Sequence, residues 1–167
     1  TVVDRMKEAG VSLIVTVDNG VTALEEIDYA AARGIDVVVT DHHRPGETLP
    51  NAVAVVDPHR SDSGYPFAGL CGAGVAFKLI CALEEDAEGM LLEHYGDLLA
   101  IATVADVVPL LDENRAMVQA GLSLLRETEN PGIRALAEKA GIDLEEITAE
   151  RIAYGIAPRL NVAGRIG

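Results

Sequence analysis

Residues 12–43 read SLIVTVDNGVTALEEIDYAAARGIDVVVTDHH, and this stretch predicts a strand, a helix and a second strand. Residues 12–17 form a β-branched apolar run, and residues 21–33 carry apolar side chains at helical spacing. Gly34 ends the helix, and residues 35–40 form a second apolar run. Because two strands joined by a helix at this spacing lie parallel, we expect a βαβ unit.

The rest of the chain extends this unit into an α/β fold. Residues 52–56 predict a third buried strand, which ends at Asp57-Pro58. From Gly72 onward the pattern becomes helical, and after Arg151 the Gly and Pro residues predict a loop. We therefore expect a parallel sheet with flanking helices, followed by a mainly helical layer. Helices are expected at residues 75–84, 91–94, 97–105, 115–126 and 133–140.

The composition is that of a soluble globular protein, with 167 residues, 49% of them hydrophobic and 24% charged. No run of 18 apolar residues exists, so we expect no membrane span. Cys71 and Cys81 are ten residues apart, a spacing that suits no common zinc pattern. Two lone cysteines indicate a reduced, cytoplasmic chain.

The net charge of −14 argues against a surface that grips nucleic acid by bulk electrostatics, because 27 acidic residues oppose 13 basic ones. One explanation is that a nucleic-acid substrate is bound mainly by other parts of the protein. The other is that the substrate is small and is held by metals at one site. An acidic surface is also common in proteins from high-salt habitats. Composition leaves these alternatives open.

Two of the predicted strands end in polar residues, at Asp18 and at Asp41-His42-His43. Ligands of an open parallel sheet bind beyond the carboxyl ends of its strands. Imidazole suits transition metals such as Mn²⁺, and carboxylate suits Mg²⁺ or Mn²⁺. One His can then bind metal while the other faces substrate, and Asp41 can orient an imidazole. The alternatives are an Asx turn with a helix N-cap at Asp18, and a solvated loop at 41–43.

Asp106 is the only charged residue between Asp97 and Asp112. The helix around it is apolar on every face, so we expect it to be buried, where an ionised carboxylate needs a partner or a cation. The alternative is a residue at the helix C-terminus that faces solvent near Pro109.

Two further motifs suit phosphate. Gly72-Ala73-Gly74 opens a helix and can present the N–H of Gly74 to a phosphate, although close packing of the helix on the sheet is the alternative. Arg159 and Arg165, with Asn161 between them, place two guanidinium groups within seven residues. Pairing with surface carboxylates is the alternative for the arginines.

Six stretches in this order resemble the DHH phosphoesterase superfamily and, within it, the RecJ-like single-strand exonucleases. The resemblance covers nearly the whole chain. The stretches are VTVDNG (15–20), VVTDHHRPG (38–46), VVDPHR (55–60), YPFAGLCGAGVAFKL (65–79), IATVADVVPLLDENR (101–115) and APRLNVAGR (157–165).

The resemblance implies a role for each candidate. Asp18 would bridge two divalent metals, Mn²⁺ or Mg²⁺, and His42 and Asp106 would be ligands of one of them. His43 would lie beside the scissile phosphate. Arg159 and Arg165 would lie near substrate phosphate, with Asn161 as structural support.

The resemblance also implies metal-dependent phosphodiester hydrolysis, in the 5′-to-3′ direction on single-stranded DNA. Residues 1–167 would form the central part of a DHH catalytic domain. Its first Asp-x-Asp motif would lie upstream and its substrate-binding domain downstream, so we expect the isolated chain to be inactive. The alternatives are a phosphodiesterase of cyclic dinucleotides or short RNA, which the APRLNVAGR stretch opposes, and an inactive scaffold, which the retained metal ligands oppose.

Overall fold

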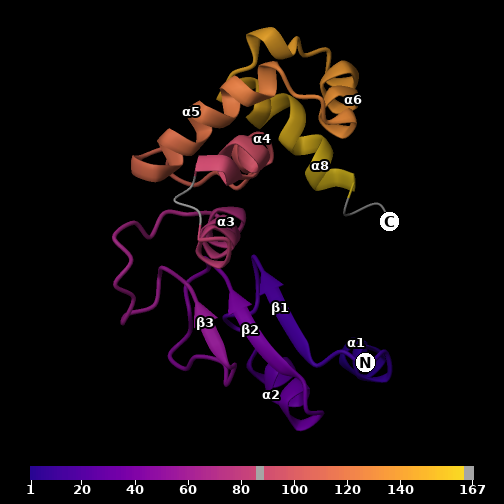
Figure 1. Ribbon diagram of the computed structural model, residues 1–167, viewed down its shortest axis with the longest axis vertical. Helices are drawn as coiled ribbons and strands as arrows, with labels where there is room; N and C mark the ends of the chain where they lie inside the picture. The colour runs from indigo at the N-terminus through magenta and orange to yellow at the C-terminus, as the bar shows by residue number, and fades with distance from the viewer. Residues whose placement is uncertain (86–88, 164–167) are drawn as a thin grey trace. The chain divides into compact units, whose positions relative to one another are not determined.

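The computed structural model divides into two compact units, Thr1–Ala76 and Phe77–Gly167 (Figure 1). The structure describes residues 1–85 and 89–163. Within these ranges, no helix combines the length and the apolar character that a membrane crossing requires.

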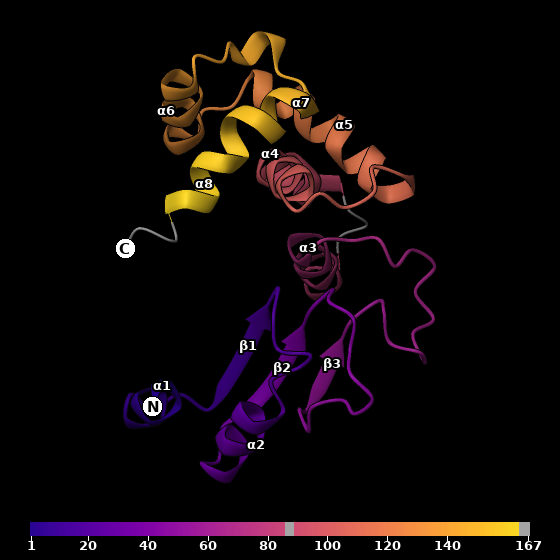
Figure 2. The same ribbon diagram turned by 180° about the vertical axis from the view of Figure 1, so that it is seen from behind.

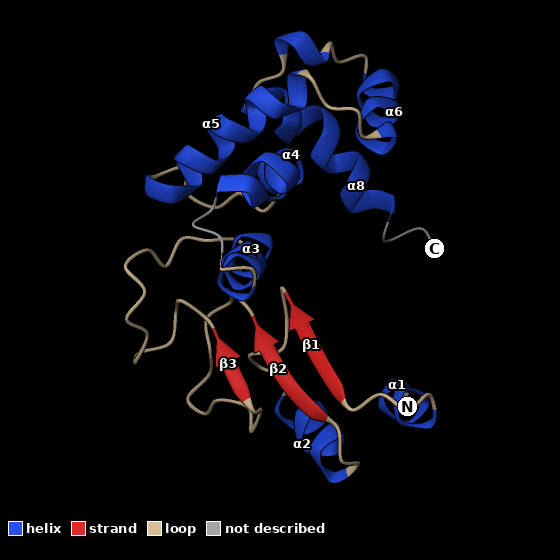
Figure 3. Ribbon diagram, viewed as in Figure 1, coloured by secondary structure: helices blue, strands red, loops and turns tan. Residues whose placement is uncertain are grey.

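The first unit is built on a parallel sheet of three strands, β1 (Leu13–Val17), β2 (Asp36–Thr40) and β3 (Ala54–Val56). The strands lie in the order β1-β2-β3, and both pairs are parallel (Figure 3). Their ends are aligned, because Thr40 pairs with Val17 on one side and with Val56 on the other. The predicted parallel sheet is confirmed.

Helix α2 (Leu24–Ala32) covers one face of this sheet (Figure 2). Its Ile27 and Ala30 pack against Val37 and Val39 of β2 and form the core of the unit. The helix is amphipathic, as the sequence predicts, but it begins three residues later than expected. A short helix, α1 (Val2–Glu8), precedes β1.

The second unit is helical, as predicted. Its core contains Leu125, Ile147, Ile152 and Ile156, all of which are almost completely buried. The predicted helices at 91–94 and 97–105 are one continuous helix, α4, which runs through the buried Gly96. The described elements are α3 (Gly72–Leu83), which begins in the first unit, α4 (Gly89–Ala105), α5 (Asp112–Arg126), α6 (Pro131–Ala140), a 3-10 turn (Leu144–Glu146) and α7 (Ala149–Arg151), followed by a π-helical turn (Ile152–Ile156) and α8 (Ala157–Ala163).

The loop predicted after Arg151 is wrong, because this segment is helical. Ile152 and Ile156 are fully buried on one side of the π-helical turn, and their packing outweighs the helix-breaking signals. Pro158 lies in the first turn of α8, directly after the wider π turn. A proline there costs little, because the first turn needs few intrahelical N–H donors.

Helices α4 and α5 cross at two glycines, and this crossing yields a stability prediction. A Cβ on Gly121 would overlap the carbonyl oxygen of Gly96 and the side chain of Ala100. Gly121→Ala should therefore lower the free energy of unfolding by about 1–2 kcal/mol, even after the gain in helix propensity. Urea denaturation measures this. Ser123→Ala, an exposed change on the same helix, should stay within about 0.5 kcal/mol of wild type. Equal stability of the two variants would contradict the prediction.

Candidate metal centre

The aligned strand ends bring three acidic residues to one edge of the sheet. Asp18 follows β1, Asp41 follows β2 and Asp57 follows β3. The sheet pairing continues into these residues, because the N–H of Asp18 donates to the carbonyl of Thr40 at 3.1 Å. In the same way, the N–H of Asp41 donates to the carbonyl of Val56 at 3.0 Å. The strand ends therefore place a row of three carboxylates at the edge where the sequence predicts a site.

Four side chains at this edge form a cluster that suits a divalent cation. Asp18, Asp41, His42 and His43 each offer one ligand atom, and these atoms all lie within 4.8 Å of one another. Nε2 of His42 lies 2.9 Å from Oδ1 of Asp18. Carboxylate oxygens and imidazole nitrogens together suit Mn²⁺, and the carboxylates suit Mg²⁺. The donor set thus fits the expected metal, and all four residues were predicted from the sequence.

Asp41 is the most constrained member of the cluster. It is buried, its Oδ2 accepts the N–H of Val21 at 2.9 Å, and its Oδ1 accepts the N–H of His42 at 2.8 Å. Oδ1 also lies 2.7 Å from Nδ1 of His43. Burial raises the pKa of Asp41, but these hydrogen bonds outweigh it and bring the pKa below its usual value. Asp41 is therefore an ionised group that fixes the imidazole of His43.

Asp18 lies in a turn, with its side chain largely exposed. Its φ of 64° is in the left-handed region, which Asp tolerates better than most residues. The turn is held by the amide of Asn19, which donates to the carbonyl of Val17 at 3.0 Å. Asp18 does not cap helix α2, because that helix begins at Leu24 and has Ala23 as its N-cap. The turn interpretation is correct, the cap interpretation is wrong, and the carboxylate stays available for a metal.

The first turn of α3 lies against Asp18. A Cβ on Gly72 would overlap the side chain of Asp18, so this position needs a residue without a side chain. Gly74 is buried, and its N–H donates to Sγ of Cys71 at 3.3 Å. A contact of Gly74 with substrate phosphate stays a prediction.

The remaining predicted site residues belong to the second unit. Asp106 is exposed and lies one residue beyond the end of α4, so the expectation that it is buried is wrong. The helix ends there because Val107 has a φ of 58° and breaks the helical geometry. The convergence of Asp106 with Asp18 and His42 stays a prediction.

Arg159 and Asn161 lie exposed on α8. The guanidinium of Arg159 donates to the carbonyl of Gly155 at 2.6 Å, rather than pairing there with a carboxylate. Arg165 lies outside the described residues.

Asp57 and His59 lie at the same edge of the sheet, and we did not predict them as site residues. Asp57 is only 4% exposed, and its Oδ1 accepts the N–H of His59 at 2.7 Å. Burial raises the pKa of Asp57, the N–H of His59 opposes this, and the nearby carboxylate of Asp41 adds to the rise. The rule that identified Asp18, an acidic residue directly after a strand, applies equally to Asp57.

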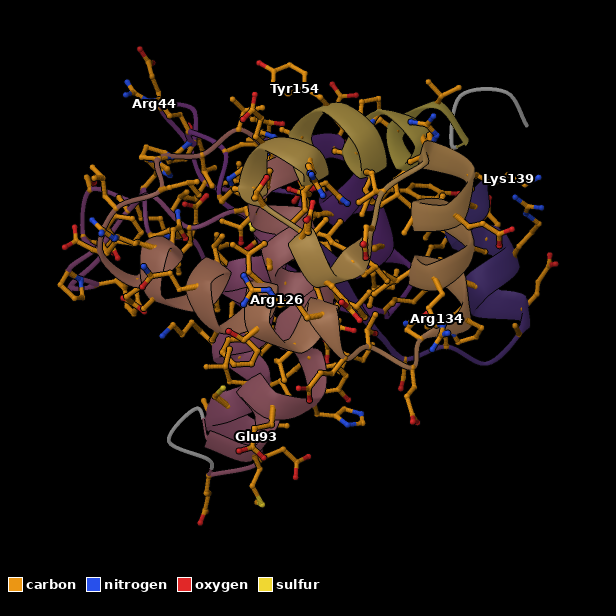
Figure 4. The ribbon with its side chains drawn as sticks, turned by 90° about the horizontal axis from the view of Figure 1, so that it is seen from above. Arg44, Glu93, Arg126, Arg134, Lys139 and Tyr154 are labelled. Carbon is orange, nitrogen blue, oxygen red and sulfur yellow. The ribbon has the colours of Figure 1, made fainter. Side chains whose placement is uncertain are left out.

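The second unit has a separate hollow of about 390 Å³. Charged side chains of both signs line it, including Arg126 of α5 and Arg134 of α6 (Figure 4). It contains none of the predicted site residues, so it plays no part in the metal centre.

Comparison with known proteins identifies relatives of this chain. The model of the DHH family, N-terminal domain, matches residues 1–103. The single-stranded-DNA-specific exonuclease RecJ of Bacillus subtilis is 47% identical over 161 residues, which are 96% of this chain and 20% of that protein. RecJ of Escherichia coli is 41% identical over 177 residues, which are 99% of this chain and 31% of that protein. The chain thus spans between a fifth and a third of the length of these curated relatives.

The chain is also similar to solved structures of RecJ. A crystal structure of exonuclease RecJ bound to manganese matches with a TM-score of 0.83 and 40% identity, over 99% of this chain and 41% of that one. RecJ from Thermus thermophilus in complex with Mn²⁺ matches with a TM-score of 0.81 and 40% identity, over 99% of this chain and 25% of that one.

Proposed function

The chain belongs to the DHH family, and from this premise we propose that it is the central part of the catalytic domain of a RecJ-like, metal-dependent exonuclease that degrades single-stranded DNA in the cytoplasm. The observation that carries the proposal is the cluster of Asp18, Asp41, His42 and His43, whose ligand atoms lie within 4.8 Å of one another. Close relatives that are exonucleases on single-stranded DNA support the reaction and the substrate.

The metal ligands of the proposed site are Asp18 and His42, with Asp106 as the predicted third ligand. Nε2 of His42 and Oδ1 of Asp18 already face each other at 2.9 Å, a separation that two ligands of one ion can adopt. A divalent metal bound here supplies Lewis-acid stabilisation of charge on a phosphate and activates water. The same donor chemistry accepts Mn²⁺ or Mg²⁺.

His43 is the substrate-facing group of the proposed site. Its side chain is 59% exposed, and Asp41 is ionised and holds Nδ1. An ionised carboxylate accepts a hydrogen bond, so Nδ1 carries the proton and Nε2 points away from Asp41. We propose that Nε2 contacts a phosphate oxygen of the substrate or takes part in proton transfer. Arg159 and Arg165 are proposed to contact substrate phosphate.

The strong negative charge limits how this chain can hold DNA. At −14, its surface repels a phosphate backbone, so affinity has to come from the metals, from single arginines, or from the remainder of a longer protein. The relatives are three to five times longer than the matched region, which is consistent with the last source.

The experiment is a nuclease assay on the full-length protein that contains this chain. With Mn²⁺ we expect digestion of single-stranded DNA from the 5′ end to mononucleotides, with little action on duplex DNA and none on cyclic dinucleotides. The 167-residue chain alone should be inactive, because it spans only 20–31% of the length of its RecJ relatives. Cleavage of cyclic dinucleotides in preference to DNA would favour the small-substrate alternative. Absence of any hydrolysis in the presence of metal would favour the inactive scaffold.

A further inference from the structure

We propose that Thr16 is a positioning residue of the metal centre, because its hydroxyl group closes the turn that carries Asp18. The carboxylate of Asp18 is thereby held where it faces Nε2 of His42. This inference rests on the proposed function of the site, and it assigns a role to a residue that the metal-ligand cluster does not include.

The hydrogen bond of Thr16 is the first support. Its Oγ1 donates to the carbonyl oxygen of Asn19 at 2.6 Å, and this bond spans the two residues between them. Asn19 in turn donates its side-chain amide to the carbonyl oxygen of Val17 at 3.0 Å. Two side chains, one on each side of Asp18 in the sequence, therefore close the same turn around it.

The backbone conformation of Asp18 makes such support necessary. Its φ of 64° lies in the left-handed region, which is disfavoured for a residue with a side chain. A residue keeps such a conformation where the surrounding structure holds it there. The side chain of Asp18 is 56% exposed, so packing does not enclose it on all sides. The hydrogen bonds of the turn therefore supply much of the restraint.

Gly20 provides the space that the hydroxyl group of Thr16 needs. It is buried and has a φ of 114°, a conformation that favours glycine. A Cβ on Gly20 would lie 2.8 Å from Oγ1 of Thr16, closer than Cβ atoms approach in proteins. A larger residue at position 20 would therefore displace the hydroxyl group from Asn19.

The end of β1 is also tied to β2, which leads into the other proposed metal ligand. Oγ1 of Thr40 donates to the carbonyl oxygen of Thr16 at 2.7 Å, and the carbonyl oxygen of Thr40 accepts the N–H of Asp18 at 3.1 Å. Thr40 is fully buried and ends β2, two residues before His42. The hydroxyl group of Thr16 thus completes a network that holds Oδ1 of Asp18 2.9 Å from Nε2 of His42.

Thr16→Val and Thr16→Ser in the full-length protein test this role. Valine keeps the branched shape and strand propensity of threonine but lacks the hydroxyl group, whereas serine keeps it. Without this hydrogen bond the turn holds Asp18 less firmly, so we expect Thr16→Val to bind Mn²⁺ about 3–10-fold more weakly than wild type. The electron paramagnetic resonance of free Mn²⁺ measures the affinity. Thr16→Ser should bind Mn²⁺ like wild type.

Thr128→Val is the matched control. Its hydroxyl group donates to Asp97 at 2.9 Å in the second unit, so this variant also loses a threonine hydrogen bond, but none in the turn of Asp18. Its Mn²⁺ affinity should equal that of wild type, although its thermal midpoint should fall. If Thr128→Val loses as much affinity as Thr16→Val, reduced stability explains both losses and the role of Thr16 is overturned.

Two further outcomes separate this role from the proposed function. Wild-type affinity in Thr16→Val, or an equal loss in Thr16→Val and Thr16→Ser, would overturn the role of the hydroxyl group while leaving the proposed function intact. A wild-type protein that binds no Mn²⁺ would overturn the proposed function, and the role of Thr16 with it.

Discussion

Replacing His43 with Ala in the full-length protein is expected to lower kcat on single-stranded DNA by about 10²–10³ and to leave Mn²⁺ affinity unchanged. The imidazole is held by Asp41 at 2.7 Å and is otherwise largely exposed, so it is placed to contact substrate. Its loss removes an interaction made during the reaction, while Asp18 and His42 keep their positions. Single-turnover kinetics and calorimetric titration with Mn²⁺ measure the two quantities separately.

His42→Ala is expected to lower Mn²⁺ affinity, which His43→Ala leaves unchanged. Its Nε2 faces the carboxylate of Asp18, so its loss removes a metal ligand and weakens Mn²⁺ binding. Excess Mn²⁺ should restore part of the activity of this variant, but none of the activity of His43→Ala. His94→Ala, an exposed histidine on α4, is the control and should match wild type. If His42→Ala and His43→Ala lose metal equally, both imidazoles are ligands and the division of roles is wrong.

The sequence could predict this cluster because local pattern and topology agree over residues 12–43. Two apolar strands joined by an amphipathic helix must lie parallel, and parallel strands end at the same edge. Asp18 and the triplet that begins at Asp41 follow directly after those strands, so their proximity needs no long-range information. The role of each residue within the cluster depends on its hydrogen bonds. Asp41 accepts from Val21 and holds His43, and residue spacing alone does not show this.

Asp57 shows what strand patterns alone miss. The third strand is only three residues long, and Asp57-Pro58 has the form of an ordinary strand end. Among the described residues, one of its carboxylate oxygens is buried without a hydrogen-bond partner, and this burial depends on side chains from the rest of the unit. Such burial is a tertiary property, and one sequence does not contain it explicitly.

The second unit shows a different limit. Gly155 and Pro158 are loop signals by local propensity, yet the segment is helical because Ile152 and Ile156 are fully buried. Gly155 has a packing reason, since a Cβ there would overlap the side chain of Ile142. Tertiary packing overrides propensity here. The expectation that Asp106 is buried is wrong for a related reason. The apolar helix ends at Ala105, so its packing does not extend to the residue that follows.

Two glycines of α3 offer the sharpest test of how the site is built. A Cβ on Gly72 would overlap the carboxyl group of Asp18, whereas a Cβ on Gly74 would meet Leu70 at 3.4 Å, which is an ordinary contact. Both changes add one methyl group to the first turn of the same helix. They differ in whether that methyl group meets the predicted metal ligand.

Gly72→Ala is expected to lower kcat/KM on single-stranded DNA by about 10²-fold and to weaken Mn²⁺ binding, because Asp18 must move to make room and a displacement of about 1 Å has this effect. Asp18 cannot relax freely, since the turn that holds it is fixed by Asn19 and by the pairing of its N–H with Thr40.

Gly74→Ala should retain nearly wild-type activity and Mn²⁺ affinity, because it leaves the backbone N–H in place and adds no clash. Thermal midpoints of both variants should be recorded, so that a general loss of folding in Gly72→Ala is distinguished from a displaced ligand. Normal Mn²⁺ binding and turnover in Gly72→Ala would show that Asp18 tolerates the methyl group. In that case, the close approach of α3 would not be what holds the carboxylate at the metal centre.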